Sequence, residues 1–304
     1  MVNKILSVAS SKGGVGKTSL VANIAGMAAT SGYRVLAVDL DPQGDLGSDL
    51  GYYGTGLDDH GQAMSEAVQY DRPLKVVKDV RPGLDVVPGG AYLDDVIRIA
   101  PNLARRGKNP RTVLAELLGP LAAGYHLILI DCPPGDRYLP DIALCASDYL
   151  LIPTRSDAAS LSGVGRLADL FVSAREVNPG VRLLGVVMFG IGASATAIQR
   201  EVRAKITAAL GGVAPVFDAQ IRYLEAPARE ARDKGMLVFE YQDKVVAGAP
   251  KWFEARKLAP SHSPGLRRVA GRAGTLAGDY AALTTQVLTQ LADDSAAEQI
   301  EATQ

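Results

Sequence analysis

The sequence predicts an α/β fold in which a doubly wound, mainly parallel sheet is flanked by helices. Two observations predict it: short apolar runs that suit buried parallel strands recur along the chain, and segments with a helical spacing of apolar residues separate them. Strands that alternate with helices favour parallel pairing through crossover connections. The predicted strands are residues 5–9, 34–39, 84–88, 126–131, 148–153 and 181–189, and the predicted helices are residues 19–32, 64–69, 111–123, 160–177 and 193–210.

Length and composition are those of a soluble globular protein. The 304 residues suffice for one large α/β domain or two modest ones, with 47% hydrophobic and 21% charged residues. The formal net charge of −1 predicts no global attraction to nucleic acid or membrane. Cys132 and Cys145 are too few for a disulfide framework, and neither lies in a metal-binding spacing. Since no apolar stretch reaches the ~18 residues of a membrane span, and the N-terminus is too short and polar for a signal peptide, we expect a cytoplasmic protein.

The pattern changes after about residue 240. Residues 244–272 hold seven Lys or Arg and a single acid, Glu254, which gives a local charge of about +6. Beyond them, a helical spacing of apolar residues predicts a final amphipathic helix that packs on the domain. We expect one domain over residues 1–292, with a basic insertion at about 244–272 and an acidic, flexible tail at 293–304. The apolar positions of the final helix are Leu276, Tyr280, Leu283, Val287 and Leu291.

Residues 10–19 read SSKGGVGKTS and predict a phosphate-binding loop between a strand and a helix. Glycines in such a loop let backbone N–H groups approach phosphate oxygens at the N-terminus of a helix. Lys17 would reach the β- and γ-phosphates, and the Thr18 hydroxyl would bind Mg²⁺. The alternative is a glycine-rich turn with a chance lysine. The candidate ATP-binding residues are Lys12, Gly13, Gly14, Val15, Gly16, Lys17, Thr18 and Ser19.

Acidic residues follow two of the predicted strands. Asp39 and Asp41 lie in VDLDPQGD, and Asp131 ends LILID. The carboxyl ends of parallel strands meet at the sheet edge where ligands bind. Asp131 therefore fits the acid that holds Mg²⁺ through water, with Asp39 as a less direct contributor, and Asp41 is a candidate to orient the attacking water. Each acid could instead be a turn residue at the end of a strand.

Three motifs in this order, KGGVGKTS, VDLDPQGD and LILIDCPPG, resemble the ParA/MinD family of deviant Walker-type ATPases. The resemblance runs from about residue 3 to 243, and the final helix also fits. In that family the lysine at the place of Lys12 reaches across a nucleotide-sandwich dimer to the phosphates bound in the other subunit. The resemblance thus implies ATP and Mg²⁺ as cofactors, and Lys12, Lys17 and Asp41 as catalytic residues.

Within the family, the sequence is most similar to the short ParA-type ATPases that lack an N-terminal helix-turn-helix domain. VDLDPQG, LDVVPGG and LLGVVMFG carry this similarity. It implies a homodimer that forms with ATP, binds DNA without sequence preference and hydrolyses ATP slowly. It also implies a ParB-type or cargo adaptor that stimulates hydrolysis, a cargo positioned on the nucleoid, and no membrane partner.

The same resemblance places DNA contacts on the helix of IQREVRAKI and after FDAQIRYL. Lys and Arg that neutralise phosphates give affinity without sequence information, and the basic insertion would add to it. A solvated, salt-bridged surface is the alternative role for these residues. The candidate DNA contacts are Arg200, Arg203, Arg222, Arg229, Arg232, Lys251, Arg256, Lys257, Arg267 and Arg268.

Two segments depart from the family pattern. Family members often have Ile-Pro-Arg near the adenine pocket, whereas this chain has Ile221-Arg222-Tyr223, so no adenine contact is assigned there. The run after LILIDCPP is more charged than usual, and Asp136 and Arg137 could alter the dimer face.

Three other functions compete with this interpretation. A MinD-like membrane-associated ATPase needs a basic amphipathic helix at the C-terminus, but no Lys or Arg follows Arg272. A metal-cluster carrier of the nitrogenase-iron-protein type needs paired cysteine ligands, which the spacing of Cys132 and Cys145 does not suggest. A scaffold that binds ATP but barely hydrolyses it would carry the same motifs.

Overall fold

A single sheet organises the chain in a computed structural model that describes residues 3–135, 137–155, 158–192, 196–210, 214–248 and 263–301. Eight strands lie in the order β3-β4-β2-β5-β1-β6-β7-β8 within these residues. All neighbouring strands pair in parallel except β3 and β4, so the doubly wound, mainly parallel sheet is confirmed. The strands are β1 (Lys4–Val8), β2 (Val35–Asp39), β3 (Val77–Arg81), β4 (Leu84–Val87), β5 (Leu127–Asp131), β6 (Tyr149–Thr154), β7 (Arg182–Ile191) and β8 (Ile221–Arg222).

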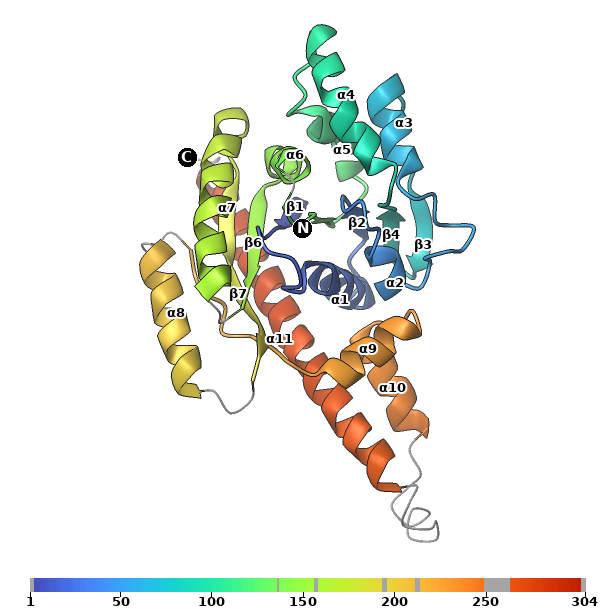
Figure 1. Cartoon of the computed structure of the whole chain (residues 1–304), viewed down its shortest axis with the longest axis vertical. Coiled ribbons are helices and arrows are strands. Elements are labelled where there is room, and N and C mark those ends of the chain that lie inside the picture. Colours follow the sequence, from blue (N-terminus) through green and yellow to red (C-terminus); the bar gives the residue numbers. More distant parts are fainter. Residues whose placement is uncertain are drawn as a thin grey trace.

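Helices cover both faces of the sheet (Figure 1). One layer contains α1 with α9, α10 and α11, and the other contains α3 to α7. The helices are α1 (Lys17–Thr30), α2 (Leu46–Asp49), α3 (Gln62–Tyr70), α4 (Leu93–Arg105), α5 (Val113–Ala122), α6 (Tyr138–Ala146), α7 (Ala158–Val177), α8 (Thr196–Leu210), α9 (Glu225–Asp233), α10 (Val238–Gly248) and α11 (Ser263–Glu301).

The central strands are buried on both faces, which explains their continuous apolar runs. Side chains alternate across a strand, so β2 supplies Leu36 and Val38 to the core beneath α3–α7, and Val35 and Ala37 to the core beneath α1 and α11. All four are fully buried. The burial holds the carboxyl ends of β1, β2 and β5 at one edge, where the predicted motifs lie.

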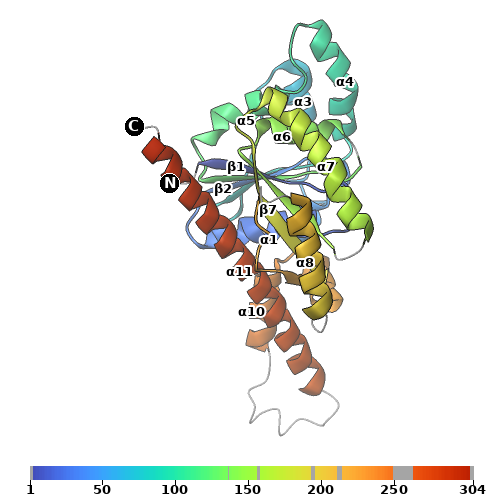
Figure 2. The same ribbon diagram turned by 90° about the vertical axis from the view of Figure 1, so that its left-hand side faces the viewer.

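The final helix, α11, runs along one side of the sheet and continues downward beside α10 (Figure 2). Its five predicted apolar positions, Leu276 to Leu291, are at most 2% exposed, which confirms that it packs on the domain. It is longer than the apolar spacing predicts: residues 263–272 of the expected basic insertion and 293–301 of the expected tail are helical. The tail sequence DDSAAEQIE contains no Pro or Gly that would end the helix. No helix among the described residues has both the length and the apolar character needed to cross a membrane.

Candidate active site

The phosphate loop lies between β1 and α1, as predicted. Gly14 and Gly16 have φ angles of +69° and +84°, which an L-residue rarely adopts. A Cβ on Gly16 would also lie 2.1 Å from the ring of Phe189 in β7. Gly16 caps α1 without a side-chain hydrogen bond, so the first N–H groups of the helix face the loop. This backbone is suited to bind an anion.

Lys17 is the first residue of α1 and is 6% exposed. Its Nζ donates a hydrogen bond to the carbonyl oxygen of Lys12 at 3.3 Å. Burial lowers the pKa of Lys17, while Asp131 and Asp41 oppose this shift. The ammonium is therefore held at the loop among carboxylates. Lys12 is half-buried at the start of the loop, where its backbone N–H donates to Ser10 Oγ.

The predicted acids meet at the ends of two adjacent strands. Asp39 of β2 and Asp131 of β5 occupy the same register position. Asp39 accepts the backbone N–H of Asp41 at 2.9 Å with one oxygen and that of Leu46 at 3.3 Å with the other. Asp41 in turn accepts the N–H of Gln43 at 2.9 Å. Asp39 thus fixes the turn that positions Asp41.

Asp131 differs from Asp39 because neither of its carboxylate oxygens has a hydrogen-bond partner among the described residues, although Asp131 is fully buried. Burial raises the pKa of Asp131, and the neighbouring Thr18 and Lys17 oppose the shift. A buried carboxylate without a partner is costly. A hydrated divalent cation beside Thr18 would satisfy it, so the residues fit Mg²⁺, which uses one or two protein ligands, waters and substrate phosphates.

The described residues offer no alternative metal centre: none of their His, Cys, Asp and Glu side chains form a group of three or more that could hold an ion. Cys132 and Cys145 are both buried. Burial raises the pKa of both thiols, that of Cys145 to about 11, so neither is a ready thiolate ligand.

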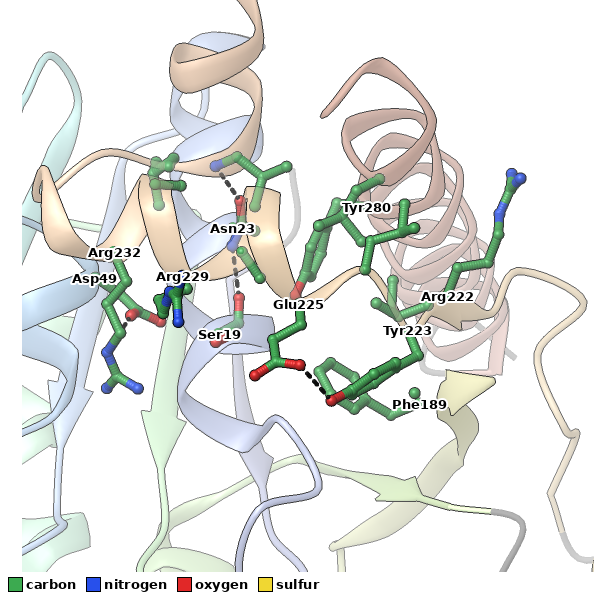
Figure 3. Close-up of a pocket in the computed structure, with 18 of the residues that line it drawn as sticks. Ser19, Asn23, Asp49, Phe189, Arg222, Tyr223, Glu225, Arg229, Arg232 and Tyr280 are labelled. Atoms are coloured by element: carbon green, nitrogen blue, oxygen red, sulfur yellow. Dashed lines mark hydrogen bonds and ion pairs between the residues drawn. The ribbon is translucent and has the colours of Figure 1, made fainter. Parts of the chain in front are cut away.

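A cavity of about 340 Å³ opens beside the loop (Figure 3). We call it the nucleoside pocket after the occupant proposed below; its size suits a small-molecule ligand. Ser19 and Asn23 of α1 line one side, and Phe189 of β7 lies against the last glycine of the loop. Other walls come from β8, α9 and α11, far along the chain. Besides these three residues, the lining includes Asp49, Arg155, Gly190, Ile221, Arg222, Tyr223, Leu224, Glu225, Ala228, Arg229, Ala231, Arg232, Met236, Leu237, Val238, Leu276 and Tyr280.

Side-chain pairs hold the walls of the nucleoside pocket together. Asn23 donates to the Ser19 carbonyl at 2.9 Å and accepts the N–H of Val238 at 3.0 Å, which joins α1 to α10 (Figure 3). Arg232 of α9 lies 3.0 Å from the buried Asp49 of α2. Burial raises the pKa of Asp49, and Arg232 and Ser19 oppose the shift.

The sequence does not predict this pocket. No adenine contact is predicted for the run Ile221-Arg222-Tyr223, and the sequence does not predict α9. Tyr280 was identified only as a core position of the final helix. The apolar spacing of the final helix was the one sequence signal at Tyr280, and such spacing does not distinguish a core residue from a residue that lines a pocket.

The candidate DNA-binding arginines fall into two groups. Arg203 donates to the carbonyls of Val216 and Phe217, Arg222 forms a bidentate pair with Asp279 of α11, and Arg232 pairs with Asp45 and Asp49. Arg200 on α8 and Arg229 on α9 are exposed.

The side chains of the other candidates are not described by the structure. Lys251, Arg256 and Lys257 fall outside the described residues, as does Asp136. Arg267 and Arg268 lie on α11, but their side chains are not among those described.

Comparison with known proteins identifies the family. The family model for an AAA domain matches residues 3–182. The chromosome partitioning protein ParA of Caulobacter vibrioides is 31% identical over 74% of this chain and 84% of its own length. The chain belongs to the ParA/MinD family of ATPases. The chromosome-partitioning ATPase Soj of Thermus thermophilus is also similar, at 32% identity over 73% of this chain and 84% of its own length.

Solved structures agree with this assignment of the ParA/MinD fold. Apo McdA has a TM-score of 0.67 at 21% identity and covers 90% of this chain and 98% of its own. Cobyrinic acid a,c-diamide synthase from Mycobacterium smegmatis, with bound ADP and magnesium, has a TM-score of 0.63 at 27% identity, covering 77% of this chain and 93% of its own. The expected ATP hydrolase of the ParA/MinD family is thereby confirmed.

Proposed function

We propose that this ATPase is a positioning switch that binds ATP and Mg²⁺, dimerises around the nucleotide and associates with DNA on the nucleoid. The position of Lys12 carries the proposal. Lys17 already supplies the ammonium of its own loop and contacts the Lys12 backbone. By resemblance to the family, the Lys12 side chain serves the phosphates bound in a second copy of the chain.

The chemistry follows from the residues at the phosphate loop. The N–H groups of the loop and Lys17 bind the phosphates, while Thr18 and Asp131, the latter through water, would hold Mg²⁺, which would supply positive charge beside the β- and γ-phosphates. Asp41, which Asp39 fixes in place, orients the attacking water. Because phosphoryl transfer depends mainly on positioning and charge stabilisation, slow hydrolysis that a partner can accelerate fits this set.

The proposed cycle needs a DNA surface and a partner. Arg200 and Arg229 are described and exposed, so they are available to phosphates. Curated relatives include chromosome partitioning proteins, and one similar solved structure is McdA. We propose that a ParB-type or cargo adaptor stimulates hydrolysis, and that the cargo is a plasmid, a chromosome or a protein assembly.

Dimerisation is tested by light scattering with ATP and Mg²⁺, using Asp41→Ala to slow hydrolysis. We expect the Asp41→Ala protein to dimerise with ATP, and the added substitution Lys12→Ala to abolish the dimer. Lys75→Ala, which removes an exposed lysine outside the loop, is the matched control. Unchanged dimerisation and hydrolysis in Lys12→Ala would refute the trans contact.

DNA association is tested by fluorescence anisotropy on two duplexes of unrelated sequence. We expect equal affinity for both, and a salt slope that falls by about 1 for each of Arg200→Ala and Arg229→Ala. Arg98→Ala, at an exposed site on α4, should change nothing. Co-sedimentation with anionic vesicles instead of DNA binding would favour the membrane-associated alternative.

A further inference from the structure

One hydroxyl in the nucleoside pocket has no protein partner. Tyr280 of α11 lines the pocket and is 2% exposed. Its hydroxyl forms no hydrogen bond with any residue that the structure describes. The buried Tyr125, by contrast, donates to Asp85 at 2.6 Å. Among the described residues, the fully enclosed polar atoms without a partner belong to Tyr52, Asp131 and Arg155, so the Tyr280 hydroxyl borders the open space of the pocket. It is therefore a donor and acceptor that a ligand can reach.

The hydroxyl is directed into the pocket. Figure 3 shows the Tyr280 ring reaching from α11 with its oxygen towards the start of α9, where Glu225 lies. Burial raises the pKa of Tyr280, and Asp49, in the facing wall of the pocket, raises it further. The phenol therefore stays neutral and keeps its proton for a hydrogen bond.

The surroundings of the hydroxyl are suited to a flat heterocycle. Phe189, Leu237 and Leu276 provide aromatic and aliphatic surface around it. The side-chain amide of Asn23, a polar neighbour, already donates to the Ser19 carbonyl and accepts the N–H of Val238. Polar side chains line the pocket as well, and Arg155 Nε is likewise without a hydrogen-bond partner among the described residues. Aromatic and aliphatic surface beside a few hydrogen-bonding groups is the usual composition of a site that stacks a base and hydrogen-bonds its edge.

We propose that the Tyr280 hydroxyl hydrogen-bonds the base of the bound nucleotide, which makes Tyr280 a specificity residue for ATP. The inference rests on the proposed function, because it takes the nucleoside pocket to receive the nucleoside of ATP. The phosphate loop then binds the triphosphate independently of Tyr280.

The test compares Tyr280→Phe with Tyr70→Phe. Phe keeps the ring at each position and removes only the oxygen. Tyr70 is the matched control because it is exposed on α3 and does not line the pocket. Calorimetry measures the affinities for ATP and for inorganic tripolyphosphate, and thermal unfolding is followed with and without ATP.

Tyr280→Phe should weaken ATP binding about 5- to 10-fold, as expected for one neutral hydrogen bond. Its affinity for tripolyphosphate should not change. Its Tm without nucleotide should stay equal or rise, because an unpartnered hydroxyl is lost, while the increase in Tm on adding ATP should shrink. Tyr70→Phe should match the wild type in all four measurements.

Two outcomes would overturn the inference. One is unchanged ATP affinity in Tyr280→Phe. The other is a lower Tm without nucleotide together with equal losses for ATP and tripolyphosphate, which would make the hydroxyl structural. A wild-type protein that binds neither compound would instead refute the proposed function.

Discussion

The two ends of the proposed nucleotide site are built in different ways. At the phosphate end, a loop of consecutive residues supplies backbone N–H groups, and two acids occupy matching positions on adjacent strands. At the nucleoside end, single side chains come from α1, α2, β7, α9 and α11 and are held by pairs such as Asp49 with Arg232. The phosphate end depends on backbone conformation, whereas the nucleoside end depends on tertiary packing.

This difference implies two kinds of vulnerability. A change at the phosphate end should remove binding of any polyphosphate and leave the fold intact. A change at the nucleoside end should weaken the binding of ATP but not of tripolyphosphate. It should also lower the stability of the fold where it breaks an ion pair between two helices. Comparison of ATP with tripolyphosphate therefore separates the two ends.

The largest effect is expected at Lys17. Lys17→Ala should lower ATP hydrolysis about 100-fold or more, because it removes the ammonium from the loop, and it should weaken tripolyphosphate binding as well. Phosphate release measures the first effect and calorimetry the second. Lys205→Ala, at an exposed lysine of α8 paired with Glu201, is the control for loss of charge. If Lys17→Ala hydrolysed ATP at the wild-type rate, the phosphate loop would have no role in hydrolysis.

Gly16→Ala tests the contact between the two ends. A methyl group there is strained by the positive φ and lies 2.1 Å from the Phe189 ring, so the loop must shift. We expect affinity for both ATP and tripolyphosphate to fall about 10-fold or more, given strain of this kind.

Gly32→Ala is the matched control for Gly16→Ala. It has a similar φ of +89° but no atom within 4 Å of the added Cβ. It should lower stability by about 1 kcal/mol and leave both affinities unchanged. Equal behaviour of the two alanine variants would show that the Phe189 contact does not matter.

The smallest effect is expected at Arg232. Arg232→Ala leaves the buried Asp49 without its cation, at a cost of about 1 to 2 kcal/mol because the arginine is itself 39% exposed. Calorimetry should show ATP binding weakened a few-fold and tripolyphosphate binding unchanged. Arg229→Ala, an exposed position on the same helix, should leave the Tm unchanged.

The loss of stability in Arg232→Ala, relative to the wild type, should depend on pH. Burial already raises the pKa of Asp49, and loss of Arg232 raises it further. The folded state then binds the proton more tightly than the unfolded state, so the stability of the variant falls as pH rises above the ordinary Asp pKa of about 4. Thermal unfolding from pH 5 to pH 8 should show a larger deficit at the higher pH. A constant deficit would mean that Asp49 and Arg232 are not coupled.

The phosphate end could be predicted from sequence because its determinants are local. SSKGGVGKTS contains its own loop, and each acid directly follows a continuous apolar run. The parallel sheet follows from the same runs. The sequence alone predicts Asp131 as the acid for Mg²⁺, and its buried carboxylate oxygens, unpartnered among the described residues, fit that role.

The nucleoside end could not be predicted because it has no local signature. β8 has only two residues, and α9 opens with EAPARE, whose proline and charges hide its helical character. α4 contains Pro101 and was missed for a similar reason. The arginines of β8 and α9 show the same limit: their charge suggested DNA, whereas three-dimensional packing gives Arg222 and Arg232 carboxylate partners.

The position of α11 has a consequence for synthesis of the chain. Asp279 pairs with Arg222 beside the pocket, and Tyr280 lines it, whereas the phosphate loop lies near the other end of the sequence. Translation proceeds from the N-terminus, so a nascent chain carries its loop and acids long before α11 leaves the ribosome. Until then the nucleoside pocket lacks one wall. Tight binding of ATP would thus begin only once α11 has left the ribosome.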